Sequence, residues 1–340
     1  MKATFSKQIF YFKRPSGTSR GVLTEKYSWY IDLFHADDST RIGRGECSVI
    51  SGLSPDFVDI NSYEEMLSKV CSNVDHYLSD LEVLNAYPSI LFGLETAFLD
   101  LKNGGKKVIF DNDFSQGKRR IPINGLIWMG DSNYLHAQIE QKLKEGFSCL
   151  KMKIGSIDFQ AELKVLETIR NRYSSEEITI RVDANGAFSP TEAQSKLNAL
   201  SIFDIHSIEQ PIEVGQWEVM KDLCLNSALP IALDEELISI TQMTQKRELL
   251  ETIVPQFIIL KPSLHGGIKG CREWIELSES MHIPWWITSA LESNVGLNAV
   301  AQFAGEYTNH LPQGLGTGSL YTNNVESDLR VENGEIFLVN

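Results

Sequence analysis

Three acidic residues recur at nearly equal intervals, and each directly follows a short apolar run. Asp183 follows residues 178–182, Glu209 follows residues 204–208, and Asp234 follows residues 229–233. The intervals are 26 and 25 positions, about the length of one strand and one helix. If each run is a buried parallel strand, the three carboxylates lie at the carboxyl ends of neighbouring strands, where α/β barrels keep their chemistry.

Three carboxylates held this close repel one another unless a cation joins them. Their hard oxygen atoms suit Mg²⁺, which binds oxygen ligands octahedrally and leaves positions for water or substrate. The alternative is that each acid caps a helix or forms an ion pair in a loop. Because the three acids end consecutive units, the metal site is the better interpretation. We therefore predict that Asp183, Glu209 and Asp234 bind Mg²⁺, with Mn²⁺ as a possible substitute.

Three lysines accompany the acids. Lys151 and Lys153 lie two positions apart on the predicted strand 149–154, so their side chains share one face. Lys261 ends the predicted strand 257–261, almost opposite in a closed barrel. Like-charge crowding lowers a lysine pKa toward the range of roughly 7–8 where the amine acts as a base. The alternative is that the lysines simply neutralise the acids.

Together these groups predict one type of reaction. A metal can hold both oxygens of a substrate carboxylate and stabilise the dianion formed when the α-proton leaves. A lysine on one face removes that proton, and a cation on the other face stabilises charge or delivers a proton. The expected partner is therefore a small-molecule carboxylate.

The elements that must position these residues alternate between strand and helix from residue 120 onward. Amphipathic helices fit most of the gaps between the predicted strands, for example at 134–145 and 159–173. Eight such units over about 200 residues predict an α/β fold, a closed (β/α)8-type barrel. The predicted strands are 121–128, 149–154, 179–183, 206–209, 231–234, 257–261, 285–289 and about 310–314.

The rest of the chain predicts a separate α+β unit. Strands are expected at 8–13, 26–34 and 41–47, and helices at 62–84 and 89–103. Residues 14–24, rich in Pro, Gly and Ser, are expected to form a mobile loop. A final strand at 335–339 is expected to return to the amino-terminal sheet. The predicted domains are 1–117, 118–318 and 319–340.

Composition narrows the class of protein. A net charge of −14 disfavours a nucleic-acid binder, which needs a basic face. No apolar run reaches membrane-spanning length, and the amino terminus lacks the apolar core of a signal peptide. The five cysteines are scattered and odd in number, which indicates reduced thiols in a cytoplasmic protein. The oligomeric state is left open.

The same motifs resemble the enolase superfamily, and within it the muconate-lactonizing subgroup, over nearly the whole chain. That resemblance implies a barrel with an α+β capping domain and a carboxyl-terminal return. It implies Asp183, Glu209 and Asp234 as Mg²⁺ ligands, Lys153 as the acid/base residue and Lys261 as the opposite-face lysine. It makes Lys151 an electrostatic neighbour of Lys153, and Asn185 and Glu235 supporting partners. The motifs are Lys151-Met152-Lys153, DAN at Asp183, EQP at Glu209, DE at Asp234 and KP at Lys261.

Within the subgroup, the segment SALESN at residues 289–294 is similar to o-succinylbenzoate synthases. This implies a hydro-lyase that converts 2-succinyl-6-hydroxy-2,4-cyclohexadiene-1-carboxylate to a menaquinone precursor. The residues expected to bind substrate are Lys151, Arg181, Ser289 and Ser293. Dipeptide epimerase, N-succinylamino acid racemase and muconate cycloisomerase remain alternatives. A non-catalytic barrel that binds Mg²⁺ or an anion is the alternative of another class, although it has no use for opposed lysines.

Overall fold

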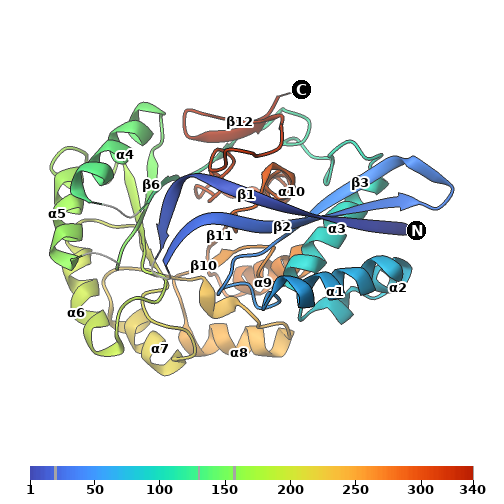
Figure 1. Cartoon of the computed structure of the whole chain (residues 1–340). Coiled ribbons are helices and arrows are strands. Elements are labelled where there is room, and N and C mark those ends of the chain that lie inside the picture. Colours follow the sequence, from blue (N-terminus) through green and yellow to red (C-terminus); the bar gives the residue numbers. More distant parts are fainter. Residues whose placement is uncertain (19–20, 129–130, 156–157, 340) are drawn as a thin grey trace.

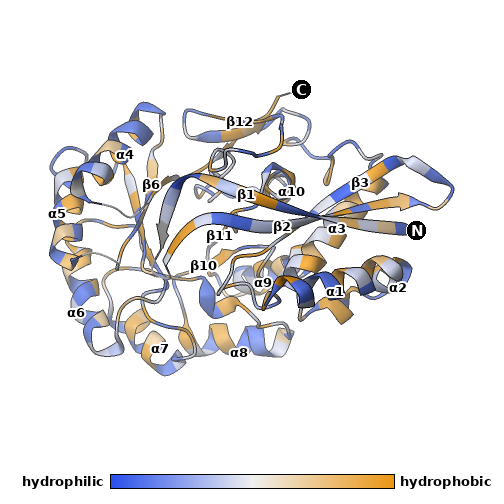
Figure 2. Ribbon diagram, viewed as in Figure 1, coloured by the Kyte–Doolittle hydropathy of each residue, from blue (hydrophilic) through white to orange (hydrophobic). Residues whose placement is uncertain are grey.

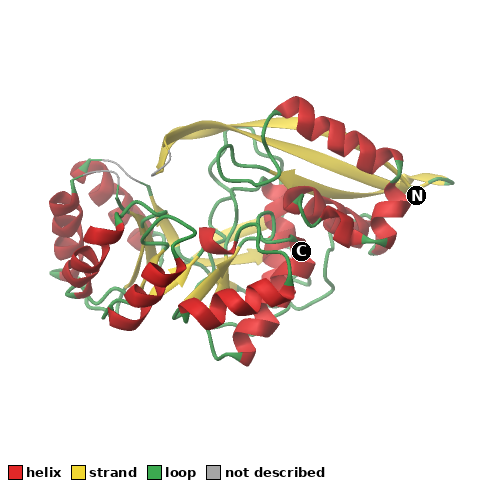
Figure 3. Cartoon of the chain, turned by 90° about the horizontal axis from the view of Figure 1, so that it is seen from below, coloured by secondary structure: helices red, strands yellow, loops and turns green. Residues whose placement is uncertain are grey.

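The protein combines an antiparallel amino-terminal sheet and its helices with a barrel of parallel strands (Figure 1). The computed structural model describes residues 1–18, 21–128, 131–155 and 158–339. Seen from below, the long amino-terminal strands lie to one side of the barrel and of the helices around it (Figure 3). The predicted fold class, a (β/α)8-type barrel with an α+β capping domain, is confirmed.

The capping domain is built on three antiparallel strands in the order β1-β2-β3. The strands are β1 (Lys2–Thr18), β2 (Gly21–His35) and β3 (Asp38–Ser48). The helices that follow are α1 (Ile60–Ser72), α2 (Val74–Ser79), the 3-10 turn η1 (Leu81–Leu84) and α3 (Pro88–Lys102). Helix α3 packs so closely on β3 that a Cβ atom added at Gly45 would lie 1.9 Å from the carbonyl oxygen of Gly93.

The prediction of a loop at residues 14–24 is wrong for most of that segment. β1 continues to Thr18, with Ser16 opposite Leu23 and Thr18 opposite Gly21 on β2. A register irregularity between Tyr11 and Ser16 absorbs the residues that do not fit a regular ladder. The composition that suggested a loop therefore marks an irregular hairpin.

The barrel wall is a sheet in which seven strands, β5 to β11, are hydrogen-bonded in chain order and parallel. The seven strands are β5 (Gly125–Ile127), β6 (Cys149–Lys153), β7 (Thr179–Asp183), β8 (Ser207–Glu209), β9 (Ile231–Leu233), β10 (Phe257–Leu260) and β11 (Trp285–Ile287). A two-residue strand, β4 (Ile121–Pro122), precedes them and belongs to a different sheet. The helices are α4 (Ser132–Lys144), α5 (Phe159–Arg170), α6 (Pro190–Ser201), α7 (Trp217–Asn226), the 3-10 turn η2 (Glu235–Leu237), α8 (Met243–Ile253), α9 (Gly267–Ser280) and α10 (Asn294–Ala304). The outer helices carry hydrophobic and hydrophilic residues side by side, as expected of helices that cover a barrel (Figure 2).

Two residues close the barrel where an eighth strand was expected. Gln313 forms a parallel bridge with Ile123, and Gly314 forms one with Thr288. The backbone N–H of Gln313 donates to the carbonyl of Pro122 at 2.8 Å, and that of Gly314 donates to Ile287 at 2.8 Å. The predicted strand at 310–314 is thus reduced to its last two residues, which join β11 to the start of the barrel.

The carboxyl-terminal strand does not return to the amino-terminal sheet, and that prediction is wrong. β12 (Leu329–Glu332) and β13 (Glu335–Leu338) form a hairpin, and β13 pairs with β4, the short strand just before β5, in a separate three-stranded sheet. The return to the capping domain comes earlier. There the N–H of Lys13 donates to Leu320 at 2.8 Å, and the N–H of Thr322 donates to Tyr11 at 2.9 Å.

All five cysteines are free thiols. None of the helices within the described ranges combines the length and the hydrophobicity needed to cross a bilayer.

Candidate active site

Strand register brings the predicted acids and lysines to one end of the barrel. Lys153 on β6 pairs with Asp183 on β7, and Asp183 pairs with Glu209 on β8. Adjacent strands lie about 4.8 Å apart, so these three residues form one row. Asp234 directly follows β9, two positions beyond the partner of Glu209. All three acids are buried, with at most 2% of their surface exposed.

The lysines point at these acids. Lys151 Nζ lies 2.9 Å from Asp183 Oδ2 and also forms an ion pair with Glu209. Lys153 Nζ lies 2.5 Å from Asp183 Oδ2 and donates to Asn185 Oδ1 at 2.6 Å. From the opposite wall, Lys261 forms an ion pair with Asp234, and its Nζ lies 3.7 Å from Glu209. The sequence therefore located a single convergent cluster of charges.

The cluster borders an internal cavity of about 160 Å³. Lys151, Lys153 and Lys261 all line this cavity. Strands β6 and β10 have three strands between them, so they lie on opposite sides of an eight-membered barrel. The capping domain supplies residues 21–23 at the start of β2 and residues 50, 51 and 53 after β3. The barrel and the capping domain thus enclose the cavity together, with two amine-bearing walls facing each other across it.

The acids and lysines shift one another's protonation. Burial and the neighbouring charge of Asp183 raise the pKa of Glu209 well above its usual value. Burial also acts to raise the pKa of Asp183 and of Asp234, but the lysine charges outweigh it and both pKa values fall.

Two lysines behave differently from the prediction. Burial acts to lower the pKa of Lys151 and of Lys261, yet the carboxylates around them outweigh it and both pKa values are raised. The expectation that like-charge crowding lowers these lysine pKa values is therefore wrong in this arrangement of side chains. The nearest charges to each amine are acids, not other amines.

The donor set fits a hard divalent cation in chemical type. Glu209 Oε1 and Asp234 Oδ1 are buried carboxylate oxygens without a hydrogen-bond donor. Such oxygens are costly unless a cation approaches them. In the part of the chain that the structure describes, no three Asp, Glu, His or Cys side chains are gathered closely enough to hold a metal. The lysines serve as the cationic partners of the acids instead.

Polar neighbours fix the turns that carry the acids. Asn185 has a left-handed φ of 45°, and its amide donates to Glu235 Oε1 at 2.9 Å. Gln210, with a φ of 40°, donates to Glu236 Oε2 at 3.1 Å and accepts from the N–H of Asp234 at 3.3 Å. Asn185 and Glu235 were expected as partners, whereas Gln210 and Glu236 were missed. Gln210 directly follows Glu209, and Glu236 directly follows Glu235. This adjacency to residues already predicted for the site was the signal that could have identified them.

The four residues predicted to bind substrate have different environments. Lys151 and Ser289 line the cavity. Ser293 does not line it: this residue caps the amino terminus of α10, and its hydroxyl donates to Glu46 Oε2 of the capping domain at 2.5 Å. Arg181 lies one layer deeper in the barrel, where its guanidinium stacks 3.9 Å from the ring centre of Trp286 and donates to the carbonyl of Pro312. Because neither Ser293 nor Arg181 lines the cavity, direct substrate contact is not expected for these two residues.

Comparison of the sequence with known proteins identifies the family of this chain. The family model described as Enolase C-terminal domain-like matches residues 134–339. The chain belongs to the enolase superfamily. A superfamily relative, an o-succinylbenzoate synthase from Desulfotalea psychrophila, is 45% identical over 98% of this chain and 98% of its own length.

Solved structures agree with that membership. The crystal structure of MenC from Desulfotalea psychrophila LSv54 matches with a TM-score of 0.87 and 42% identity, and the match covers 99% of each chain. The crystal structure of a dipeptide epimerase from Enterococcus faecalis V583, complexed with Mg and L-Leu-L-Tyr, matches with a TM-score of 0.85 over 99% of this chain and 96% of its own. At 19% identity, this second likeness is one of fold. The resemblance to the enolase superfamily predicted from the sequence is confirmed.

Proposed function

We propose that this protein is a Mg²⁺-dependent o-succinylbenzoate synthase. It would dehydrate 2-succinyl-6-hydroxy-2,4-cyclohexadiene-1-carboxylate to o-succinylbenzoate, a step in menaquinone biosynthesis. The observation that carries the proposal is the 45% identity to an o-succinylbenzoate synthase over 98% of both chains. A cavity between opposed lysines supports the same reaction class, proton abstraction next to a carboxylate.

The proposed metal ligands are Asp183, Glu209 and Asp234, for Mg²⁺ or, as a substitute, Mn²⁺. Their hard oxygen donors and the two buried carboxylate oxygens without hydrogen bonds support this assignment. When bound, Mg²⁺ supplies positive charge that stabilises negative charge developing on the substrate carboxylate. The five free thiols support a cytoplasmic location.

The chain's own residues would move the proton. Lys153, in its neutral form, takes the proton from ring carbon 1, and the electrons of that C–H bond form an enediolate anion. The C–O bond at carbon 6 then breaks, and hydroxide takes the proton back from Lys153 and leaves as water. Asp183 and Asn185 hold the Lys153 amine in place through contacts of 2.5 and 2.6 Å. Lys261, on the opposite wall, stabilises the anion electrostatically.

The alternatives differ in the charge of their substrates. A dipeptide carries an ammonium group that needs a carboxylate partner, and no acidic side chain among the described residues lines the cavity. The three lysines there instead favour an anionic substrate. N-succinylamino acids and muconate are anionic too, so racemase and cycloisomerase activities require direct assay.

The decisive experiment measures kcat/KM of the purified protein for the cyclohexadiene substrate, a panel of dipeptides, several N-succinylamino acids and muconate. We expect the cyclohexadiene substrate to have the highest kcat/KM. A higher value for any other substrate would overturn the assignment. Binding without turnover of any substrate would favour the non-catalytic barrel.

A further inference from the structure

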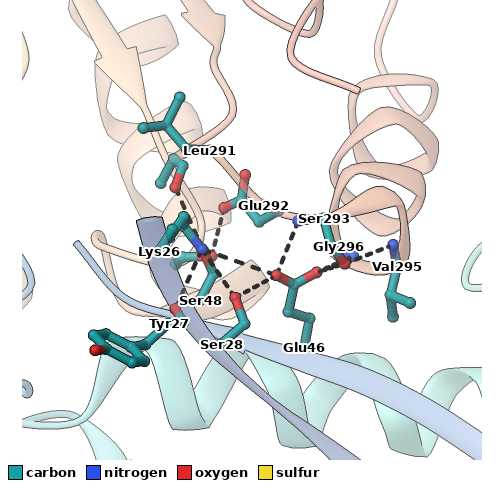
Figure 4. Close-up of polar contacts among 12 residues, drawn as sticks. Lys26, Tyr27, Ser28, Glu46, Ser48, Leu291, Glu292, Ser293, Val295 and Gly296 are labelled. Carbon is teal, nitrogen blue, oxygen red and sulfur yellow. Dashed lines mark hydrogen bonds and ion pairs between the residues drawn. The ribbon is translucent and has the colours of Figure 1, made fainter. Parts of the chain in front are cut away.

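A buried polar network connects the capping domain to the wall of the cavity (Figure 4). On the capping side, the ammonium of Lys26 donates to Ser48 Oγ at 2.7 Å and to Ser28 Oγ at 2.9 Å. Ser28 in turn donates to Glu46 at 2.7 Å. On the barrel side stands Glu292, whose side chain is completely buried between β11 and α10.

The carboxylate of Glu292 accepts hydrogen bonds from two serine hydroxyls. Ser263 Oγ donates to its Oε1 at 2.6 Å, and Ser289 Oγ donates to its Oε2 at 2.5 Å. Thr317 Oγ1 donates to Ser289 Oγ at 2.8 Å. Ser289 and Thr317 both line the cavity, whereas Glu292 does not. Among the described residues, Ser289 therefore connects Glu292 to the cavity.

The hydrogen-bonding capacity of a hydroxyl sets what Ser289 can do. A serine hydroxyl has one proton to donate and two lone pairs that accept. The Ser289 hydroxyl donates its hydrogen bond to Glu292, and one of its lone pairs accepts a hydrogen bond from the Thr317 hydroxyl. Toward the cavity Ser289 therefore presents a lone pair and no proton.

The direction of the Ser289 hydroxyl depends on whether Glu292 is ionised, and nearby charges affect this ionisation. The pKa of Glu292 is raised, mainly by burial and further by the charge of Glu46, whereas the hydroxyls of Ser263 and Ser289 and the positive charge of Lys26 act to lower it. Lys26 is itself buried, with 5% of its surface exposed, and serves as the nearby cation for both Glu46 and Glu292. The hydrogen bonds from Ser263 and Ser289 and the charge of Lys26 thus favour the carboxylate form of Glu292, which accepts, against its burial and the charge of Glu46.

The substrate of the proposed function has a single group that matches an acceptor. With both carboxylates ionised, its only hydrogen-bond donor is the ring hydroxyl, the group that leaves. We propose that Glu292 is a positioning residue, which orients Ser289 to accept a hydrogen bond from this hydroxyl. The inference rests on the proposed function. A hydroxyl whose proton faces Ser289 turns its lone pairs away from Ser289, open to the proton that Lys153 returns.

The test is a double-mutant cycle with Glu292→Gln, Ser289→Ala and the double variant, assayed with the cyclohexadiene substrate. An amide at 292 donates as well as accepts, so Ser289 loses its fixed direction. Each single variant should lower kcat/KM about tenfold, the effect of one lost hydrogen bond. The double variant should fall no further than Ser289→Ala alone. Inhibition by o-succinylbenzoate, which lacks the hydroxyl, should change less than about twofold.

Matched controls separate positioning from general damage. Glu95→Gln alters another buried carboxylate between the domains, and Ser278→Ala removes another buried hydroxyl. Neither should show coupling to Ser289→Ala in kcat/KM. If Glu292→Gln fails to fold, Thr317→Val is the substitute, because Thr317 is the other residue that fixes the direction of the Ser289 hydroxyl. Its effect on kcat/KM should likewise disappear in the Ser289→Ala background.

Additive losses in either cycle would overturn the proposal, as would unchanged kcat/KM in Glu292→Gln. An equal loss of product binding in Glu292→Gln would overturn it too, because the product has no hydroxyl to lose. Failure of the proposed function is distinguishable, since the unaltered protein would then not turn over the cyclohexadiene substrate.

Discussion

Glu46 should be among the residues on which the stability of the two-domain structure depends most. It is completely buried, accepts from Ser28 Oγ at 2.7 Å and from the N–H groups of Ser293 and Gly296 at 2.9 and 2.8 Å. Lys26 Nζ lies 4.0 Å away. Glu46→Ala would leave these donors without an acceptor and Lys26 with an uncompensated buried charge. Breaking a buried pair in this way costs about 3–5 kcal/mol.

The assay is equilibrium unfolding in urea, followed by tryptophan fluorescence and far-UV circular dichroism. The midpoint should fall while the slope with urea concentration stays constant. Glu46→Gln, which retains one acceptor oxygen, should lose about 1–3 kcal/mol. The matched control is Asp32→Ala, which breaks the more exposed ion pair with Arg44 on the same sheet. Pairs of that kind contribute about 0–1 kcal/mol.

A loss below about 1 kcal/mol in Glu46→Ala, no larger than a surface pair, would refute this reasoning. It would mean that water reaches the cluster, or that the domains separate at little cost.

Three further predictions follow from other residues. Burial raises the pKa of Glu95 from its usual 4.5 to about 7, so the unfolded chain releases this proton first and stability falls as pH rises between those values; Glu95→Gln should flatten the slope of unfolding free energy with pH, and an unchanged slope would contradict it. Mg²⁺ should raise the thermal midpoint of the protein and of Asp222→Asn, an exposed control, but not of Asp234→Asn; an equal shift in Asp234→Asn would remove that residue from the metal site. Ser293→Ala should destabilise by about 1–2 kcal/mol, through loss of a helix cap and a buried hydrogen bond, with kcat/KM unchanged; reduced turnover at full stability would restore its role in substrate binding.

The sequence was most informative where chemistry and periodicity coincide. Alternation along the strand predicted that Lys151 and Lys153 share a face, and the register of β6, β7 and β8 places Lys153 beside Asp183. The two adjacent tryptophans of β11 face opposite sides of the strand in the same way. Trp286 lies inside the barrel over Arg181, and Trp285 contacts Tyr307 on the helix side.

What the sequence could not supply was the direction of long side chains and pairing over long distances. Arg181 lies level with its register partner Lys151, which lines the cavity, but its guanidinium instead packs on Trp286 and donates to the carbonyl of Pro312. Ser293 is the N-cap residue of α10, and it bonds to Glu46, which lies 247 residues away in the sequence. The pairing of β13 with β4 likewise depends on how the chain returns, which local pattern does not encode.

The central claim is that Lys153 carries the proton in a dehydration reaction. The most direct measurement compares single-turnover dehydration of the cyclohexadiene substrate by the unaltered protein, by Lys153→Ala, and by Lys164→Ala as a control at an exposed lysine on α5. Mg²⁺ binding is followed in parallel by calorimetry. We predict a fall of about 10²–10⁴-fold in Lys153→Ala alone, with Mg²⁺ binding retained. A near-normal rate in Lys153→Ala would contradict the mechanism.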